Sequence, residues 1–419
     1  MHRSVCLVLT FALAATPAGA DVFRLLDDPR DAAQARVDII QQADDEISAM
    51  YFLARDDRIT LGALALLRDA KRRGVPRVRL IVDAGFHRIP KAVLAHLRDE
   101  GVEIKVYHPF TLRHPSWLLR RMHEKVVVVD GKRYITGGRN LAEAYFGLAD
   151  GENYVDRDVY VDGPSAADAD RHFESLWSSK HVAKLRVHVS RNDKEIAAQI
   201  LGEVLSELER TGFIALNTGR DWSEGQKQVD AVRFLHDPVD GDSPRLAAHL
   251  AKILESAEES IVIESPYFVP SKSMRTLLYR KLGEGVKVQV LTNSLRSTDG
   301  ILPQAAYLKY RRRMLRAGMD VREFKGPDPL HAKTIVVDSR IVLVGSYNID
   351  PRSEFFNTEV MCLVEDEEIA RETLRSIDTH LDHAWTIQRG GEDVHEVSPA
   401  TSLRVWAARL ILPLIENQL

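Results

Sequence analysis

The chain contains little cysteine and carries little net charge. Its 419 residues include two cysteines, Cys6 and Cys362, and the formal net charge is −4. Cys6 lies in an N-terminal segment that we expect to be removed, so Cys362 would remain alone and no internal disulfide could form. The core must therefore stabilise the fold. A net charge this small provides no general basic field, which does not favour a nucleic-acid partner.

Long hydrophobic runs are also scarce, and the one near the start of the chain is short. A basic start, an apolar run at 5–15 and small residues at 18–20 predict a secretory signal peptide at residues 1–20. The apolar run is too short for a comfortable membrane span, and a retained N-terminal anchor is the alternative. The segment predicts export across the inner membrane and a periplasmic protein that is peripheral on the membrane.

One stretch in the first half combines a buried strand with three polar side chains. Four consecutive valines at 126–129, followed by an Asp-Gly turn, predict a buried strand and a tight hairpin. Alternate side chains of a strand share one face, so His123 and Lys125 should point the same way. The returning strand brings Asn140 towards the start of the first. The hairpin would therefore group an imidazole, an ammonium and a carboxamide.

The same spacing occurs a second time, which indicates a tandem duplication. His331, Lys333 and Asn348 repeat the first copy, and both copies have the pattern H-x-K-x4-D-x6-G-[GS]-x-N. Two copies with identical internal spacing make coincidence a poor explanation, and the elements before each hairpin repeat in order as well. The remaining motif positions, which we interpret as structural, are Asp130, Gly137, Gly138, Asp338, Gly345 and Ser346.

Alternating helix and strand patterns precede each hairpin and predict an α/β fold. We expect two tandem α/β sandwich repeats around a pseudo-two-fold axis, with the active site at their interface. In the first half the patterns place helices at 32–46, 61–73 and 92–99 and strands at 47–53, 78–82 and 102–107. The expected divisions are a first repeat at 21–185, a connecting segment at 186–235, a second repeat at 236–390 and a C-terminal tail at 391–419.

The paired motif resembles the signature of the phospholipase D superfamily. Residues 137–147, 293–299 and 348–359 are also similar to the bacterial cardiolipin synthases of the C type. This likeness runs from about Phe23 to the last residue, and the chain departs from that group at 48–51 and in its shorter length. It implies two phospholipase D-like repeats, no cofactor, and transfer of a phosphatidyl group through a covalent phosphohistidine intermediate.

The resemblance also implies partners and alternatives. The expected substrates are phospholipids at a membrane surface: phosphatidylglycerol, with phosphatidylethanolamine or cardiolipin as further candidates. Transfer to phosphatidylglycerol would make cardiolipin, whereas transfer to water, as in a phospholipase D, would make phosphatidic acid. Other hypotheses are a secreted nuclease, which would need a basic groove, and an inert lipid-binding protein, which would have lost a motif residue. The segment 114–121 could dip into lipid or plug the pocket, and the segment 402–419 could lie in the membrane interface or pack on the core as a terminal helix.

Placed face to face, the two hairpins would enclose a positively biased pocket suited to a phosphodiester. The lysines and amides would neutralise the charge that builds up on the phosphoryl oxygens. One histidine would attack phosphorus, and the other would protonate the departing oxygen and then activate the acceptor. The resemblance implies His123 as nucleophile and His331 as acid/base, but the sequence alone does not order them. Lysine is not a usual metal ligand, so we expect no metal.

Each histidine also needs an acceptor on its far nitrogen to hold its tautomer. We expect Glu359 to hold His331, because it lies on the next predicted strand of the same copy. Its counterpart Asp156 should hold His123, with Asp158 on the same strand face as the alternative.

Several other polar residues have a simpler interpretation. Asp130 and Asp338 precede turns, so we expect them to close hairpins. The motif glycines should allow close backbone packing rather than bind phosphate. His108, His114 and His236 fit no pattern and are interpreted as ordinary loop or surface histidines.

Overall fold

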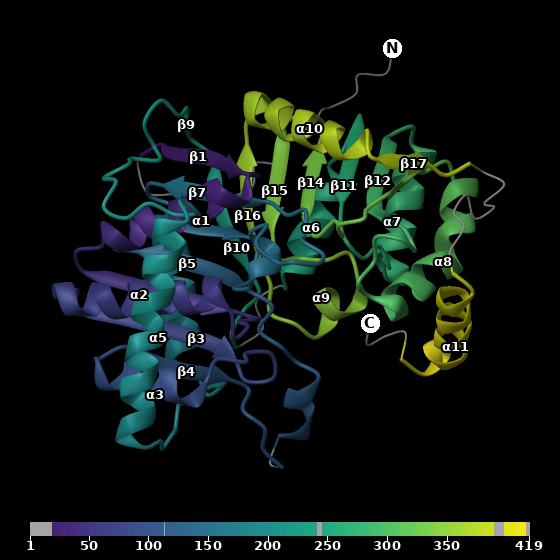
Figure 1. Ribbon diagram of the computed structural model, residues 1–419. Helices are drawn as coiled ribbons and strands as arrows, with labels where there is room; N and C mark the ends of the chain where they lie inside the picture. The colour runs from purple at the N-terminus through teal and green to yellow at the C-terminus, as the bar shows by residue number, and fades with distance from the viewer. Residues whose placement is uncertain (1–18, 113, 241–244, 389–397, 416–419) are drawn as a thin grey trace.

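The structure, a computed structural model, describes residues 19–112, 114–240, 245–388 and 398–415. Two mixed sheets, each accompanied by helices, lie side by side (Figure 1). Most of the predicted signal peptide and part of the predicted C-terminal tail fall outside the described residues. No helix within the described ranges combines the length and the apolar character needed to cross a membrane.

The two sheets have the same strand order, apart from one extra strand in the first. The first sheet runs β8 (Val182–Lys184), β4 (Glu103–Tyr107), β3 (Arg77–Asp83), β2 (Glu46–Tyr51), β5 (Lys125–Val129), β6 (Arg133–Gly137), β7 (Asp158–Asp162), β1 (Asp21–Leu26) and β9 (Gln228–Val229). The second runs β17 (Ala384–Thr386), β13 (Asp320–Phe324), β12 (Lys287–Asn293), β11 (Ser260–Glu264), β14 (Thr334–Val337), β15 (Ile341–Gly345), β16 (Val360–Glu365) and β10 (Val232–His236).

Each sheet joins a parallel unit to an antiparallel hairpin. The strands β2, β3 and β4 are parallel, and so are β11, β12 and β13. The hairpins β5–β6 and β14–β15 pair beside them through β2 and β11. This matching topology confirms the predicted fold class of two α/β repeats.

The helices cover the sheets in the same order in both repeats. In the first repeat they are α1 (Pro29–Gln41), α2 (Arg58–Arg73), α3 (Lys91–Asp99) and α4 (Ala166–Ser178), with short turns η1 (Pro115–Leu118) and η2 (Glu143–Tyr145). In the second repeat they are α6 (Leu246–Glu255), α7 (Lys272–Gly283), α8 (Ile301–Arg316), α9 (Pro351–Phe355) and α10 (Glu367–Leu381). The helix expected at 32–46 ends earlier, because Glu46 already begins β2.

The four valines of β5 explain how the repeats are joined. Val127 and Val129 belong to the core beneath α1 and α2, whereas Val126 and Val128 face the other way into a second core. That second core contains side chains from both sheets, including Tyr134 of β6 and Cys362 of β16, whose hydroxyl and sulfur atoms lie 3.2 Å apart. Burial on both faces accounts for the continuous apolar run. The shared core fixes the two repeats against each other.

The segment 186–235 is more structured than the predicted connection. It contains α5 (Arg191–Arg210), which packs on α2 and α3 and buries Leu201, Leu205 and Leu208. It also contains β10, which pairs with β16 and so belongs to the second sheet. The second repeat therefore begins at this strand rather than at 236.

The C-terminal helix has two different faces. The helix α11 (Pro399–Ile415) packs on α8, and it buries Val405, Ala408 and Leu412. Its other face exposes Leu403, Trp406 and Leu410. Two roles were predicted for this segment, packing on the protein and contact with lipid. Packing on the protein accounts for only one face of the helix.

Candidate active site

The two motif histidines lie at the interface between the repeats, each just before its hairpin. The backbone N–H of His123 donates to the carbonyl of Thr358 in the other repeat at 2.9 Å. In the same way, the N–H of His331 donates to the carbonyl of Val155 at 2.7 Å. These short bridges bring each histidine against the segment that precedes the last long strand of the opposite repeat.

Because each histidine lies against the opposite repeat, the carboxylate that orients it also comes from that repeat. Nδ1 of His123 lies 3.0 Å from Oε2 of Glu359, and Nδ1 of His331 lies 2.6 Å from Oδ2 of Asp156. Both carboxylates were predicted, but the predicted pairing within each repeat is wrong, because the bridged segments cross the interface. With Nδ1 held, Nε2 is the nitrogen of each ring that can react with phosphate.

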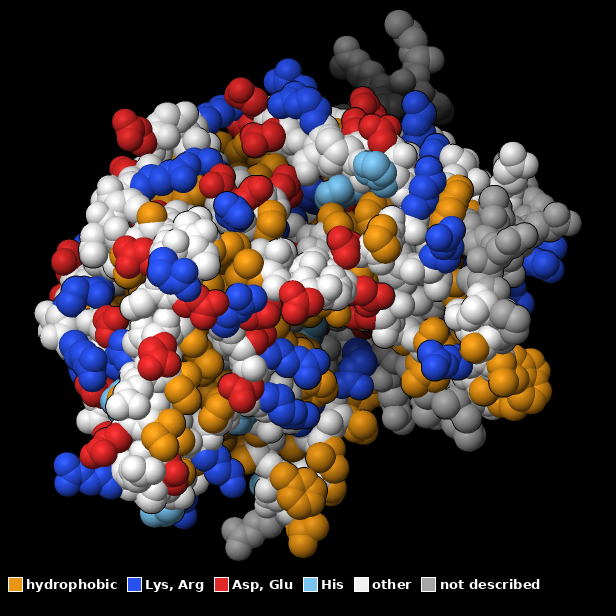
Figure 2. Space-filling model, viewed as in Figure 1, with side chains coloured by type: hydrophobic (Ala, Val, Ile, Leu, Met, Phe, Trp, Pro, Cys, Tyr) orange, Lys and Arg blue, Asp and Glu red, His pale blue; other side chains and the backbone are white. Residues whose placement is uncertain are grey.

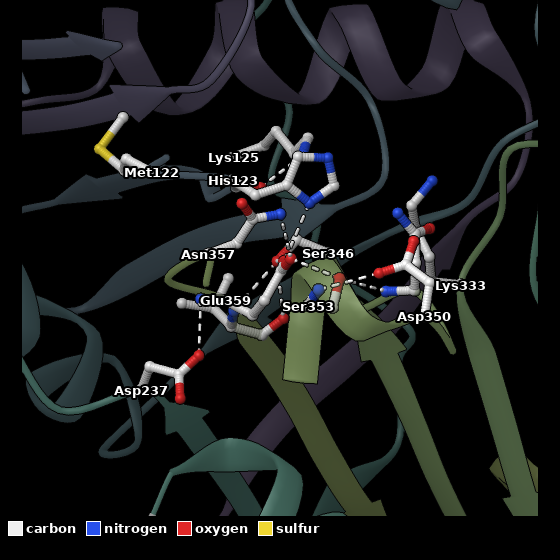
Figure 3. A network of polar contacts seen from close by, with 12 residues as sticks. Met122, His123, Lys125, Asp237, Lys333, Ser346, Asp350, Ser353, Asn357 and Glu359 are labelled. Atoms are coloured by element: carbon white, nitrogen blue, oxygen red, sulfur yellow. Dashed lines mark hydrogen bonds and ion pairs between the residues drawn. The ribbon is translucent and has the colours of Figure 1, made fainter. Parts of the chain in front are cut away.

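The carboxylate of Glu359 is held by hydroxyl and amide donors. Ser346 donates to Oε2, while Ser353 and Asn357 donate to Oε1 at 2.7 and 3.3 Å. Figure 3 shows these side chains and His123 converging on Glu359. Ser346 was predicted to be purely structural, and it instead contacts the orienting carboxylate. Ser353 and Asn357 were not predicted, although both lie in the stretch that resembles the cardiolipin synthases.

Two buried lysines complete the centre of the site. Nζ of Lys125 donates to the backbone carbonyl of His123, and Nζ of Lys333 donates to that of His331. Burial lowers the pKa of Lys125 to about 7 and that of Lys333 to about 8. Both lysines are therefore only partly protonated near neutral pH. A bound anion would stabilise their charged form.

The imidazoles and their carboxylates are also shifted from their ordinary ionisation. Burial lowers the pKa of His123 to about 4, and Lys125 adds to this effect. Burial and the charge of Lys333 likewise lower the pKa of His331. Burial opposes ionisation of Glu359, but His123 and Lys125 outweigh it and lower the pKa of this carboxyl. Neutral imidazoles beside ionised carboxylates suit a nucleophile held in one tautomer.

The two motif amides differ in their surroundings. Oδ1 of Asn140 accepts the backbone N–H of Leu53 at 3.3 Å. Oδ1 of Asn348 is buried and has no hydrogen-bond partner among the described residues. Because amide oxygen and nitrogen can exchange by a side-chain flip, Asn348 can offer either an acceptor or a donor to a bound group.

The motif aspartates stabilise the repeats away from this centre. Asp130 accepts the backbone N–H groups of residues 44–46 at 2.8–3.1 Å, and Asp338 accepts those of 258–260 at 2.8–2.9 Å. Each carboxylate therefore holds the start of the neighbouring strand, β2 or β11, as well as ending its own. This is a structural role, although broader than closing a hairpin.

The motif glycines allow backbone and carboxylates to approach closely. A Cβ atom at Gly138 would collide with the carboxylate of Asp156, and one at Gly345 would collide with the backbone of Val360. At Gly137 it would collide with Asp158, whose carboxylate forms an ion pair with Arg36 at 2.9 Å. Asp158 therefore does not orient a histidine.

Of the unassigned histidines, His114 is an exposed loop residue as predicted, whereas His108 and His236 are not simple surface residues. His108 is buried, and its ring stacks on Trp117 with centroids 4.5 Å apart, while His114 stacks on the same indole. His236 stacks on His172 at 4.1 Å. Within the described part of the chain, no three His, Cys, Asp or Glu side chains group as a metal site requires.

Comparisons with known proteins agree with this duplicated site. The family model described as "Cardiolipin synthase, PLD-like domain" matches residues 37–177 and 250–381, so each matched part contains one hairpin. Cardiolipin synthase C of Escherichia coli (strain K12) is 31% identical over 410 residues, covering 87% of this chain and 85% of that protein. The chain belongs to this family, within the phospholipase D superfamily.

Two further proteins are similar to this chain, one in sequence and one in structure. An uncharacterized protein of Helicobacter pylori (strain ATCC 700392 / 26695) is 29% identical over 398 residues, covering 86% of this chain and 79% of that protein. The crystal structure of phosphatidylserine synthase from Haemophilus influenzae Rd KW20 matches with a TM-score of 0.71 over 95% of both chains, at 17% identity. At that identity the structural likeness shows the fold alone. The protein is a cardiolipin synthase-like phosphatidyltransferase.

Proposed function

We propose that the enzyme transfers a phosphatidyl group from a glycerophospholipid to the hydroxyl of a second lipid or of a simple alcohol. With phosphatidylglycerol as donor and acceptor the product is cardiolipin, and phosphatidylethanolamine is a further candidate donor. The observation that carries this proposal is the pair of imidazole–carboxylate contacts beside Lys125 and Lys333 at the repeat interface. The likeness to cardiolipin synthase C supports the class of substrate.

The geometry suits a two-step displacement at phosphorus. Nε2 of His123 attacks, the bond from phosphorus to the headgroup oxygen breaks, and that oxygen takes a proton from Nε2 of His331. The anionic phosphodiester stabilises the protonated His331, and Lys125 and Lys333 stabilise the charge on the phosphoryl oxygens. In the second step the acceptor hydroxyl attacks phosphorus, its proton passes to His331, and the electron pair of the P–N bond returns to His123.

Water can replace the alcohol in the second step, and the product is then phosphatidic acid. The same side chains serve transfer and hydrolysis, so the two outcomes are separated by measuring both products. A nuclease is less well supported, because Lys, Arg, Asp and Glu side chains are interspersed on the face shown in Figure 2. A binding role for nucleic acid would favour a continuous basic surface.

The enzyme is further proposed to work at a membrane surface. The loop before β5 exposes Phe110 (73%) and Leu112 (88%) together with Leu118 and Leu119. Figure 2 shows apolar side chains projecting at the lower tip of the molecule, over this loop, and again at the lower right, over α11. Contiguous exposed apolar groups of this kind favour contact with lipid. The predicted signal peptide at 1–20 supports a periplasmic location for this contact.

The proposed activity is tested with purified protein and vesicles that contain isotopically labelled phosphatidylglycerol, with and without phosphatidylethanolamine. We expect labelled cardiolipin from the wild-type protein, and phosphatidic acid where water competes. The variants His123→Ala and His331→Ala serve as inactive controls. Absence of any phosphatidyl product or phosphatidic acid from correctly folded wild-type protein would refute the proposal.

A further inference from the structure

A second polar cluster lies beside the active site and is built from both repeats. The hydroxyl of Tyr154, from the first repeat, donates to Oδ2 of Asp299 at 2.9 Å. The hydroxyl of Tyr267, from the second repeat, donates to Oδ1 of the same carboxylate at 2.6 Å. Asp299 therefore bridges the two repeats through one hydrogen bond on each of its oxygens.

This cluster lies next to one histidine only. The rings of Tyr145 and Tyr154 stack on each other at 4.4 Å, and the edge of each packs against His331 with centroids 5.1 Å apart. His123 instead has Phe52 at 4.8 Å. The pseudo-symmetric site is thus chemically asymmetric, with hydroxyl and carboxylate groups near His331 and a phenyl ring near His123.

The carboxylate of Asp299 can accept further hydrogen bonds. Its side chain is exposed, and no Lys or Arg among the described residues forms an ion pair with it. Each carboxylate oxygen has two lone-pair positions and uses one for a tyrosine, so one remains on each. The charge of Asp299 also raises the pKa of His331, although burial and the charge of Lys333 lower this pKa by more. This effect favours the protonated form that an acid/base histidine needs beside the leaving alcohol.

We propose that Asp299, positioned by Tyr154 and Tyr267, binds the alcohol beside His331 and selects acceptors that carry two neighbouring hydroxyl groups. One hydroxyl of such an alcohol attacks phosphorus, while the adjacent one donates to Asp299. A monohydric alcohol cannot make the second contact, and an acceptor with a negative charge next to its hydroxyl is repelled. This inference rests on the proposed function and specifies the acceptor side of the same site.

The assignment also orders the two histidines. When the acceptor oxygen beside His331 bonds to phosphorus, the P–N bond to His123 breaks and its electron pair returns to the imidazole. The acceptor proton goes to His331. The diacylglycerol part stays on phosphorus throughout, so only the exchanging alcohols need the polar cluster. The phenyl ring of Phe52 near His123 has no group that could hydrogen-bond an alcohol.

The experiment compares two soluble acceptors. Purified enzyme is given phosphatidylglycerol vesicles with deuterated glycerol or deuterated 1-propanol, and the labelled phosphatidyl products are measured by mass spectrometry. The quantity of interest is the ratio of kcat/KM for glycerol to kcat/KM for 1-propanol. We expect Asp299→Asn to lower this ratio about tenfold, as expected for one lost hydrogen bond to a charged group. We expect Tyr154→Phe and Tyr267→Phe to lower it by a smaller factor.

The matched control is Glu152→Gln, which removes an exposed charge close to Tyr154 without touching Asp299. It should leave the ratio unchanged. Melting temperatures identify any variant that is poorly folded, and the two tyrosine variants then provide the test. An unchanged ratio in Asp299→Asn, or an equal drop in Glu152→Gln, would overturn the inference. So would a larger loss with deuterated ethanolamine than with glycerol, because that would indicate an ammonium site. If wild-type protein yields no labelled product and no phosphatidic acid, the proposed function itself fails.

Discussion

His123 of the first repeat is oriented by Glu359 of the second, with 3.0 Å between Nδ1 and Oε2. The reciprocal contact joins His331 to Asp156 at 2.6 Å. Neither half-site is complete within one repeat, because each imidazole takes its orienting carboxylate from the other. The catalytic unit is therefore the packed pair of repeats.

The exchanged carboxylates predict different defects. Glu359→Gln keeps the shape of the side chain but removes the charge that stabilises His123, and we expect turnover to fall by roughly 10⁴ with no detectable phosphatidyl adduct. Asp156→Asn should slow turnover similarly through His331, but labelled adduct should still accumulate over long incubations. Acid quenching and mass spectrometry of the protein distinguish the two. The opposite pattern would exchange the roles of the histidines.

Asp130 should affect stability rather than chemistry. Its carboxylate accepts three backbone N–H groups at the start of β2, so Asp130→Asn weakens a set of charge-assisted hydrogen bonds. We expect a loss of about 1–3 kcal/mol in the free energy of unfolding. Activity per folded molecule should stay near that of the wild type at low temperature. Denaturant titration together with an activity assay checks this, and a normal stability with lost activity would contradict it.

The buried lysines predict a fall in activity at alkaline pH. Burial lowers the pKa of Lys125 to about 7 and that of Lys333 to about 8, so the free enzyme loses positive charge as the pH rises through this range. We expect kcat/KM to decrease as the pH rises above about 7. A bound anion raises both lysine pKa values, so kcat should decrease only at higher pH. Separate pH profiles of the two constants provide the measurement, and coincident profiles would argue against this account.

The exposed loop before β5 should contribute to lipid binding. Replacing Phe110 and Leu112 by Glu introduces charge at the most exposed apolar positions, and we expect vesicle binding to fall at least tenfold in a flotation assay. Ile196→Glu is the matched control, because Ile196 is an exposed apolar residue on α5, far along the chain from this loop. Equal loss in the control would indicate a general charge effect instead.

Activity should survive an excess of chelator. The two ammonium groups supply the positive charge that a bound cation provides in other phosphoryl-transfer sites. Incubation with EDTA followed by the vesicle assay tests this directly. Loss of activity that one divalent ion alone restores would show that the lysines are not sufficient.

Much of the site followed from local sequence patterns. The period of a strand places His123 and Lys125 on one face whatever surrounds them, and the second copy repeats this geometry at His331 and Lys333. Glu359 was selected on the predicted strand after the second hairpin, and Asp156 was selected as its counterpart because it lies seven positions before Gly163, as Glu359 lies seven before Asp366. These are properties of single hairpins and their neighbours in the chain, so spacing alone was enough to find them.

The pairing across the interface was decided only by the tertiary structure. Whether Glu359 contacts His331 or His123 depends on how the two sheets pack through their shared core. An apolar sequence pattern predicts that a residue is buried, but it does not predict which residues it is buried against. The same holds for Ser346 beneath Glu359 and for Asp299 between two tyrosines from different repeats. The sequence by itself determined which groups carry the chemistry, because local geometry places them. Packing of one repeat on the other determined which group acts on which.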